Sequence, residues 1–303
     1  MAALGAISAW SQTSTELGTC HLFPPDNIWN TPVDSLPVDA NSDAYIVTIG
    51  ASRSLHPDFG TGAIGIPYVT VPGDQPKVNI SFLYGDESDS GGYPVPADAP
   101  VESGSDRHVL VVDRDNCILY ELLAASLQPD GSWQAGSGAI YDLNCSCLRP
   151  ATWTSADAAG LPILPGLVRY DEVAAGAIEH AIRFTVPQTR KDFVWPARHY
   201  ASQLKDAQFP PMGQRFRLKA SFDISSFSPE VQVILLALKK YGMILADNGS
   251  AWFISGVPDE RWNNDILVNQ LRKVQGSDFE AVDESSLMLT ADSARAAVPA
   301  QLR

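Results

Sequence analysis

The chain has 303 residues, with 21 basic and 35 acidic side chains and a formal net charge of −14. Apolar residues make up 45% of the chain and charged residues 18%, which is typical of a folded protein with one large domain or two small ones. The excess of acids argues against a general nucleic-acid-binding protein, because phosphate contacts need clustered Lys and Arg. No stretch approaches the ~20 consecutive apolar residues of a membrane span, so we expect no membrane partner.

The charge is distributed unevenly along the chain. The first 100 residues contain only Arg53 and Lys77 as basic residues, against eleven acids, whereas residues 183–219 contain eight basic residues and two acids. Two interpretations of this basic stripe are open. It could pair with acidic groups of the same fold, or it could line a cleft that receives a carboxylated or phosphorylated ligand.

The chain has four cysteines, Cys20, Cys117, Cys145 and Cys147. Their spacing does not suit a metal, because there is no Cys-x-x-Cys, and we expect no cofactor. A bond between Cys145 and Cys147 would be strained, so we expect Cys20 to pair with Cys117 or with one of the other two. Free buried thiols are the alternative. Disulfides, few lysines and many Pro, Ser, Thr and Asn residues favour a secreted or periplasmic protein.

The two ends of the chain differ in composition from its body. Residues 1–19 lack the basic region and apolar core of an intact signal peptide, and we expect a flexible leader there. Residues 284–303 are polar and rich in Ala, which predicts a weakly ordered tail. No clean linker interrupts residues 20–283, so the sequence predicts a single globular domain over this range.

The first half of the chain has the pattern of short strands. Residues 20–100 hold eleven of the 22 prolines, which predicts irregular structure with short edge strands. Further on, turn-forming residues 113–116 separate two β-branched and apolar runs, a pattern typical of a hairpin. The strands predicted in this half are 66–71, 78–84, 108–112, 118–122 and 138–143.

Helices begin later in the chain. A helix is expected from Asp171 to about Ile182, and a second from Ser228 to Gly242, with Pro229 in its first turn. The remaining predicted elements are strands 183–186, 215–222, 243–246 and 251–255 and a helix over 259–273. Strands dominate without regular strand–helix alternation, which predicts an α+β, β-rich fold: a sandwich or barrel-like antiparallel core with a few helices packed on it.

Several common catalytic motifs are absent from the sequence. There is no Gly-x-Gly-x-x-Gly, no Gly-x-x-x-x-Gly-Lys-Ser/Thr, no His-Glu-x-x-His and no Gly-x-Ser-x-Gly. Their absence disfavours dinucleotide binding, P-loop chemistry, zinc-dependent proteolysis and the common serine hydrolases.

One short segment combines side chains suited to ligand binding. Trp195 offers a flat face for a sugar ring, and Arg198 could bind a carboxylate or phosphate. His199 and Tyr200 could transfer protons, and His180, near a predicted helix end, is a further candidate for substrate binding. The alternative is a packed loop in which Trp195 belongs to the core and Arg198 bonds a neighbouring Asp.

Paired carboxyl groups point to glycoside hydrolysis. That reaction needs two of them, one with a raised pKa that acts as the acid. Strand ends hold side chains rigidly at a surface, which suits catalysis. The candidates are Glu121, Asp142, Asp157, Glu179 and Asp247, although Asp247 could instead stabilise the Asn248-Gly249 turn.

The main hypothesis is therefore a secreted carbohydrate-active enzyme, a glycoside hydrolase in which Asp142 or Glu179 protonates the leaving oxygen and Asp157 or Asp247 acts as base or nucleophile. One alternative is a polysaccharide lyase on uronate glycans. In it, Arg198 neutralises the carboxylate and His199 or Tyr200 takes the proton. Another is a non-catalytic glycan-binding or self-assembling extracellular protein. Each version of the hypothesis that involves a glycan predicts a polysaccharide or oligosaccharide partner.

Overall fold

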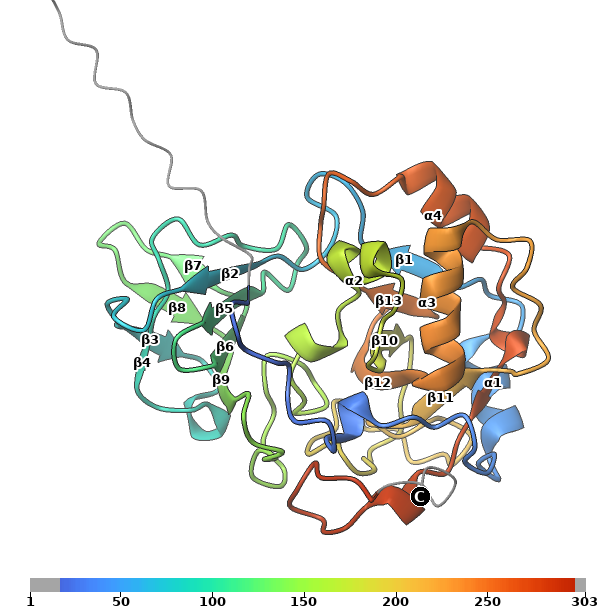
Figure 1. Cartoon of the computed structure of the whole chain (residues 1–303). Coiled ribbons are helices and arrows are strands. Elements are labelled where there is room, and N and C mark those ends of the chain that lie inside the picture. Colours follow the sequence, from blue (N-terminus) through green and yellow to red (C-terminus); the bar gives the residue numbers. More distant parts are fainter. Residues whose placement is uncertain (1–16, 298–303) are drawn as a thin grey trace, which may run out of the picture.

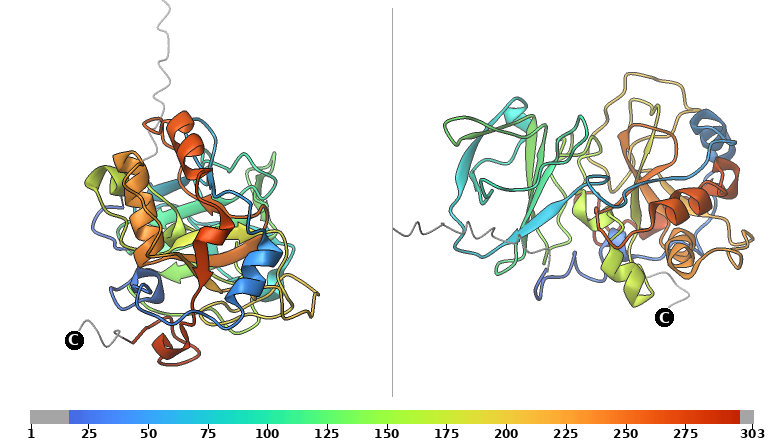
Figure 2. Two further views of the ribbon diagram at one scale, coloured as in Figure 1. Left: turned by 90° about the vertical axis from the view of Figure 1, so that its right-hand side faces the viewer. Right: turned by 90° about the horizontal axis from the view of Figure 1, so that it is seen from above.

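The computed structural model describes residues 17–297. Residues 1–16 of the predicted leader and 298–303 of the predicted tail therefore lie outside the described residues. The fold is α+β and rich in strands, as expected, with strands arranged in three sheets. Figures 1 and 2 show two lobes side by side: β2–β9 form one, and the other contains β1, β10–β14 and the helices.

The first lobe is a sandwich of two four-stranded sheets that share an apolar core. Tyr120 of one sheet and Tyr93 and Trp133 of the other belong to this core. The first sheet, in spatial order, is β2 (Tyr68–Val71), β5 (Val109–Asp113), β6 (Ile118–Leu123) and β9 (Ser137–Asp142). The second is β4 (Gly92–Tyr93), β3 (Val78–Phe82), β8 (Trp133–Ala135) and β7 (Ser126–Leu127).

The predicted hairpin forms β5 and β6. These strands pair antiparallel with Val111 opposite Tyr120, and the Asp113 carboxylate accepts backbone hydrogen bonds in the turn from Asp115 and Asn116. Successive residues of a strand point to opposite faces. Val111 therefore faces the sandwich core, while Leu110 lies in the larger core that the first sheet shares with the second lobe.

The second lobe is built on a six-stranded sheet. In spatial order its strands are β1 (His56–Asp58), β13 (Phe253–Ser255), β10 (Ile182–Val186), β12 (Met243–Asn248), β11 (Arg215–Leu218) and β14 (Phe279–Ala281). The α-helices are α1 (Ser42–Ile49), α2 (Tyr170–Ala175), α3 (Pro229–Lys240) and α4 (Asn264–Leu271). Short 3₁₀ helices cover Ile28–Asn30, Gly85–Glu87, Leu164–Gly166, Gly276–Asp278 and Ser285–Leu287.

Helix α3 begins and ends close to the predicted positions. Pro229 is its first residue, since a missing N–H costs nothing there, and Ser228 holds the N-cap position without a side-chain capping bond. Gly242 follows the helix with φ of +67°, and a Cβ at this position would lie 2.2 Å from the carbonyl oxygen of Phe216. Only glycine fits this close turn into β12.

Other elements differ from the sequence prediction. The sheets are mixed: β10 pairs parallel with β12 but antiparallel with β13, for example. The helix expected from Asp171 to Ile182 ends at Ala175, because Gly176 adopts the left-handed conformation that stops a helix. Helix α4 begins at Asn264, where the side chain of Asn263 accepts a capping bond from the backbone N–H of Ile266. Helix α1 and strand β14 lay outside the predicted elements.

Residues 284–297 of the expected tail make defined contacts with the body. The backbone N–H of Ala294 donates to Ser146, and the carbonyl of Ala294 accepts from Ile28. Arg295 forms an ion pair with Asp26 at 2.6 Å. These contacts tie the C-terminal segment to the start of the described chain.

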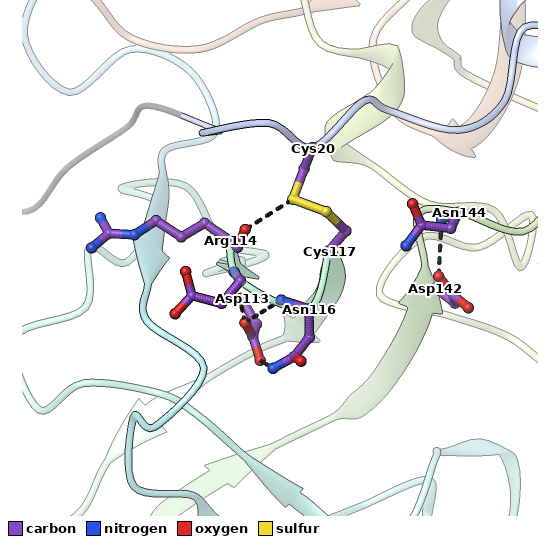
Figure 3. Close-up of a disulfide and its surroundings, with 8 residues drawn as sticks. Cys20, Asp113, Arg114, Asn116, Cys117, Asp142 and Asn144 are labelled. Carbon is purple, nitrogen blue, oxygen red and sulfur yellow. Dashed lines mark hydrogen bonds between the residues drawn. A yellow bond between two sulfur atoms is a disulfide. The ribbon is translucent and has the colours of Figure 1, made fainter.

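The structure pairs all four cysteines. Cys20 is bonded to Cys117, one of the pairings expected, and Figure 3 shows the N-terminal segment reaching the turn between β5 and β6. Cys145 is bonded to Cys147, the pairing that the sequence disfavoured because only one residue separates the two cysteines. Within residues 17–297 no helix is long and apolar enough to span a membrane.

Candidate active site

One face of the six-stranded sheet is polar where β1, β13, β10 and β12 lie side by side. On β10 the core residue Phe184 pairs with Ile254 of β13, so its neighbours Arg183 and Thr185 point to the opposite face. Ser255, beside Arg183, lies on this face, and Asp58 of β1 pairs with Ser255. The sheet thus presents charged and hydroxyl side chains on the side away from its apolar core.

A β-bulge brings Asp247 to this polar face. Arg183 and Phe184 pair with Ile244 and Leu245, but a register shift then places Asp247, instead of Ala246, opposite Thr185. In an unbroken strand Asp247 would share the core face of Leu245. Bulges re-aim side chains in this way, often beside active sites.

The polar face lines a cavity of 180 Å³ between the two lobes. The first lobe contributes residues that lead into β5. Four carboxyl groups line the cavity: Asp58, Glu102, Asp106 and Asp247. Its other polar residues are His108, Arg183, Thr185, Asn248, Ser250 and Ser255. The concentration of titratable groups in one cavity makes this the candidate active site.

Arg183 forms the base of the cavity and is held by Asp157. Its Nε and Nη2 donate to the two oxygens of Asp157 at 2.6 and 2.7 Å, and its Nη1 donates to Ser255 Oγ at 2.6 Å. The Asp157 carboxylate is completely buried. Because both of its oxygens bind Arg183, Asp157 positions the guanidinium and has no direct access to a substrate.

Asp247 is poised to carry a proton. Burial, together with the negative charge of Asp157, raises the pKa of the Asp247 carboxyl to about 7, although Arg183 opposes this shift from 4.0 Å. Burial also raises the pKa of Asp58, on the same cavity wall. Asp247 is therefore partly protonated near neutral pH, as a general acid must be.

The pKa of Glu102 is shifted in the opposite direction to that of Asp247. Burial alone would raise its pKa, but hydrogen bonding to His108 and the charge of His108 outweigh burial and lower the pKa. His108 Nδ1 lies 2.6 Å from Glu102 Oε2, and His108 Nε2 lies 3.1 Å from the carbonyl oxygen of Ala156. Since both ring nitrogens face acceptors, His108 is an imidazolium, and the bond to Glu102 raises its pKa despite burial. The cavity thus combines an ionised carboxylate with a carboxyl that retains its proton.

The structure brings together only two of the carboxyl groups predicted from the sequence, Asp157 and Asp247. Asp142 is exposed at the end of β9, where it accepts a hydrogen bond from the backbone of Asn144 (Figure 3). Glu179 lies on a separate cavity of 630 Å³ that also contains His180. His180 is occupied there by Glu172, at 3.2 Å, and by its neighbour's carbonyl.

The segment 195–200 is a packed loop. Trp195 Nε1 donates to the carbonyl of Ser293 at 2.8 Å, and Arg198 donates to Ala291 and Asp292 at 2.7 and 2.8 Å. His199 Nδ1 lies 3.0 Å from the carbonyl of Ala158, and its ring stacks on Tyr200. Trp195 and Arg198 anchor the C-terminal segment, and none of these four side chains lines the 180 Å³ cavity.

The arginines of the basic stripe are paired inside the fold. Besides Arg183 and Arg198, Arg215 binds Glu284 and Arg217 binds Glu280. This pattern fits the first interpretation of the stripe, in which it neutralises acids of the same chain. Among residues 17–297, no group of three or more His, Cys, Asp or Glu side chains is arranged to hold a metal ion.

Sequence reasoning did not assign Asp58, Glu102 or Arg183 to the site. Asp58 ends a three-residue strand in a proline-rich stretch, and Glu102 lies in a loop, so neither has a periodic signal. The one available signal was His108, which follows Asp106 and Arg107 at the start of a predicted strand.

No protein-family model, curated protein or solved structure matches this chain.

Proposed function

We propose that the chain is a secreted glycoside hydrolase whose acid–base pair is Asp247 and Glu102. The observation that supports this most directly is the contrast between two carboxyl groups on one cavity: burial raises the pKa of Asp247 to about 7, while His108 lowers that of Glu102. Two titratable groups whose pKa values are shifted in opposite directions by their surroundings identify the acid and the base of a site. The assignment makes Asp247 the acid, because it is the one that retains a proton.

In the proposed reaction Asp247 gives up one proton and Glu102 takes up another. Asp247 donates its proton to the glycosidic oxygen as the bond from that oxygen to the anomeric carbon breaks. Glu102 takes a proton from the water that adds to the anomeric carbon. Asp247 leaves the reaction as a carboxylate and Glu102 as a carboxylic acid, and proton exchange with solvent restores both.

The cavity lining suits a hydroxyl-rich ligand. Carboxylates, Asn248 and the hydroxyls of Thr185 and Ser250 can donate to or accept from sugar hydroxyls, and Phe253 offers an apolar face. The volume of 180 Å³ is below the roughly 300–1,000 Å³ of sites for drug-sized ligands. We therefore propose that one sugar unit enters the cavity while the rest of the glycan remains outside.

The proposed location follows from the cysteines. Two disulfides within residues 17–297 favour an oxidising compartment, which supports secretion or a periplasmic location.

The test is hydrolysis of a panel of neutral and acidic polysaccharides, followed by reducing-end release. Asp247→Asn and Glu102→Gln should each lower the rate at least about 100-fold. Asp142→Asn and Glu179→Gln are matched controls, since they make the same chemical changes at exposed sites outside the cavity, and they should leave the rate unchanged.

Three outcomes would contradict the proposal. Reducing ends accompanied by ultraviolet absorbance of an unsaturated product would indicate a lyase. Retention on a polysaccharide gel without any cleavage would indicate a binding protein. Full activity in Asp247→Asn would show that the acid lies elsewhere.

A further inference from the structure

The two disulfides differ in exposure and in the length of chain that each one closes. Cys20 is buried and Cys117 is half-buried, and their bond joins residues 97 positions apart. Cys145 is half-buried and Cys147 is exposed, and a single residue lies between them. A crosslink restricts the unfolded chain more when it closes a longer loop. The bond between Cys145 and Cys147 therefore contributes little to the stability of the fold.

The exposure of Cys147 leaves this second bond open to exchange. A disulfide exchanges when a thiolate attacks one of its sulfur atoms, so access to that sulfur limits the rate. Exposed disulfides are therefore the ones that external thiols reduce most readily, whereas buried structural disulfides resist reduction. Cys147 also lines a cavity of 150 Å³ together with Asp142 and Arg149, so a small molecule has room beside the bond.

The residue between the two cysteines is a docking point for the C-terminal segment. The carbonyl oxygen of Ser146 accepts hydrogen bonds from the backbone N–H of Ala294 at 2.9 Å and from the hydroxyl of Ser293 at 3.0 Å. Cys147 forms an antiparallel bridge with Ser293. The small ring that the disulfide closes restrains the backbone of Ser146, so it helps to fix the direction of the carbonyl that receives these two hydrogen bonds.

We propose that the Cys145–Cys147 disulfide is a thiol-exchange site whose substrate is a low-molecular-weight thiol such as glutathione, and that its reduction loosens the C-terminal segment. This site is independent of the proposed hydrolase chemistry.

The exchange takes place in two steps. The thiolate of the small molecule attacks Cys147 Sγ, and a mixed disulfide forms as the bond to Cys145 breaks. Cys145 leaves as a thiolate and takes a proton from solvent. A second thiolate then attacks the sulfur of the bound small molecule, which releases a small-molecule disulfide and leaves Cys147 to take a proton. The protein gains two electrons and two protons, and two thiols are oxidised to one disulfide.

The first test is incubation of the folded full chain with excess reduced glutathione, followed by alkylation at timed intervals and mass spectrometry of the cysteine peptides. We expect Cys145 and Cys147 to be alkylated at least about tenfold faster than Cys20 and Cys117, because access to sulfur limits exchange. Equal rates, or faster loss of the Cys20–Cys117 bond, would overturn the proposal. So would alkylation of Cys145 and Cys147 without added thiol, since there would then be no bond to exchange.

Hydrogen exchange tests the effect on the C-terminal segment. In Cys145→Ser with Cys147→Ser, the amide of Ala294 should exchange at least about tenfold faster than in the unaltered chain, while the amides of β5 keep their rates. Ser146→Ala keeps the ring and the carbonyl, so it is the control and should exchange as the unaltered chain does.

A second measurement needs no substitution. The chain reduced by glutathione, with its Cys20–Cys117 bond intact, should show the same local increase in exchange at Ala294. If exchange at Ala294 is unchanged both in this reduced chain and in the double variant, the proposed effect on the C-terminal segment is wrong.

Discussion

Arg183 and Asp157 form a buried, two-point ion pair directly beneath the candidate active site. The two parallel hydrogen bonds measure 2.6 and 2.7 Å, and the side chains are 5% and 0% exposed, respectively. This geometry is the strongest form of the interaction between guanidinium and carboxylate. It links the stability of the fold to the proposed acid, because the same Asp157 charge that holds Arg183 raises the pKa of Asp247.

The first prediction concerns this pair. Asp157→Asn removes the hydrogen-bonded counter-charge of the buried Arg183 guanidinium and leaves only Asp247, at 4.0 Å, within ion-pair distance, so we expect the free energy of unfolding to fall by about 3–5 kcal/mol. Asp259→Asn, in the exposed pair with Arg261, should cost less than about 1 kcal/mol. Urea denaturation measures both. Similar losses of unfolding free energy in the two variants would show that burial does not make the Asp157 pair more stabilising than an exposed pair.

The second prediction concerns the pH dependence of hydrolysis. A general acid must be protonated, so activity should fall as the pH rises above about 7, the pKa of Asp247. The fall should approach tenfold per pH unit. Asp157→Asn removes a negative neighbour that raises this pKa, so in any folded fraction the decline should begin at lower pH. A rate profile that stays flat through neutral pH would contradict the role of Asp247.

The sequence predicted the fold class and many strands but not the arrangement of the sheets. Local signals were sufficient for the hairpin at β5 and β6, where turn residues separate two apolar runs, and for α3, where Ser228, Pro229 and Gly242 mark the ends. Strand β1 pairs with β13, nearly 200 residues later, and has only three residues. No local pattern predicts such a pairing, because its stability comes from tertiary contacts.

The candidate site was harder to predict for the same reason. Asp247 was among the sequence candidates, but its presence on the polar face depends on a bulge after Phe184, which shifts the register by one residue. Glu102 comes from the other lobe, and its pKa is lowered mainly by contact with His108 and further by the charge of Arg183. Arg198 looked like a ligand-binding residue because its partner, Asp292, lies 94 residues away in a segment expected to be weakly ordered.

The third prediction concerns the disulfides. The Cys20–Cys117 bond spans 97 residues, whereas Cys145–Cys147 spans two. A crosslink restricts the unfolded chain more when it closes a longer loop. Cys20→Ser with Cys117→Ser should therefore lower the free energy of unfolding by about 2–5 kcal/mol, and Cys145→Ser with Cys147→Ser by much less. Denaturation without reductant measures both, and a larger loss from the second pair would contradict the argument.

The fourth prediction concerns Glu121 of β6, a buried carboxyl that does not line the 180 Å³ cavity. Both oxygens accept the backbone N–H of Ile163, and one also accepts that of Leu164, all at 2.9 Å. Burial nevertheless dominates and raises its pKa from 4.5 to about 7. Between these values the folded protein holds a proton that the unfolded chain releases, so the contribution of Glu121 to stability is greatest below pH 4.5 and is lost as the pH rises towards 7.

Glu121→Gln removes this ionisation while it keeps the shape and one acceptor oxygen. The unfolding free energy of the variant, relative to that of the unaltered chain, should therefore rise with pH across this window, by up to about 1.4 kcal/mol per pH unit. Urea denaturation at a series of pH values measures the difference. Glu179→Gln makes the same change at an exposed position and should show no such trend. If the curves for Glu121→Gln and the unaltered chain run parallel, the backbone hydrogen bonds from Ile163 and Leu164 offset burial fully, and Glu121 has the same pKa in the folded and unfolded chain.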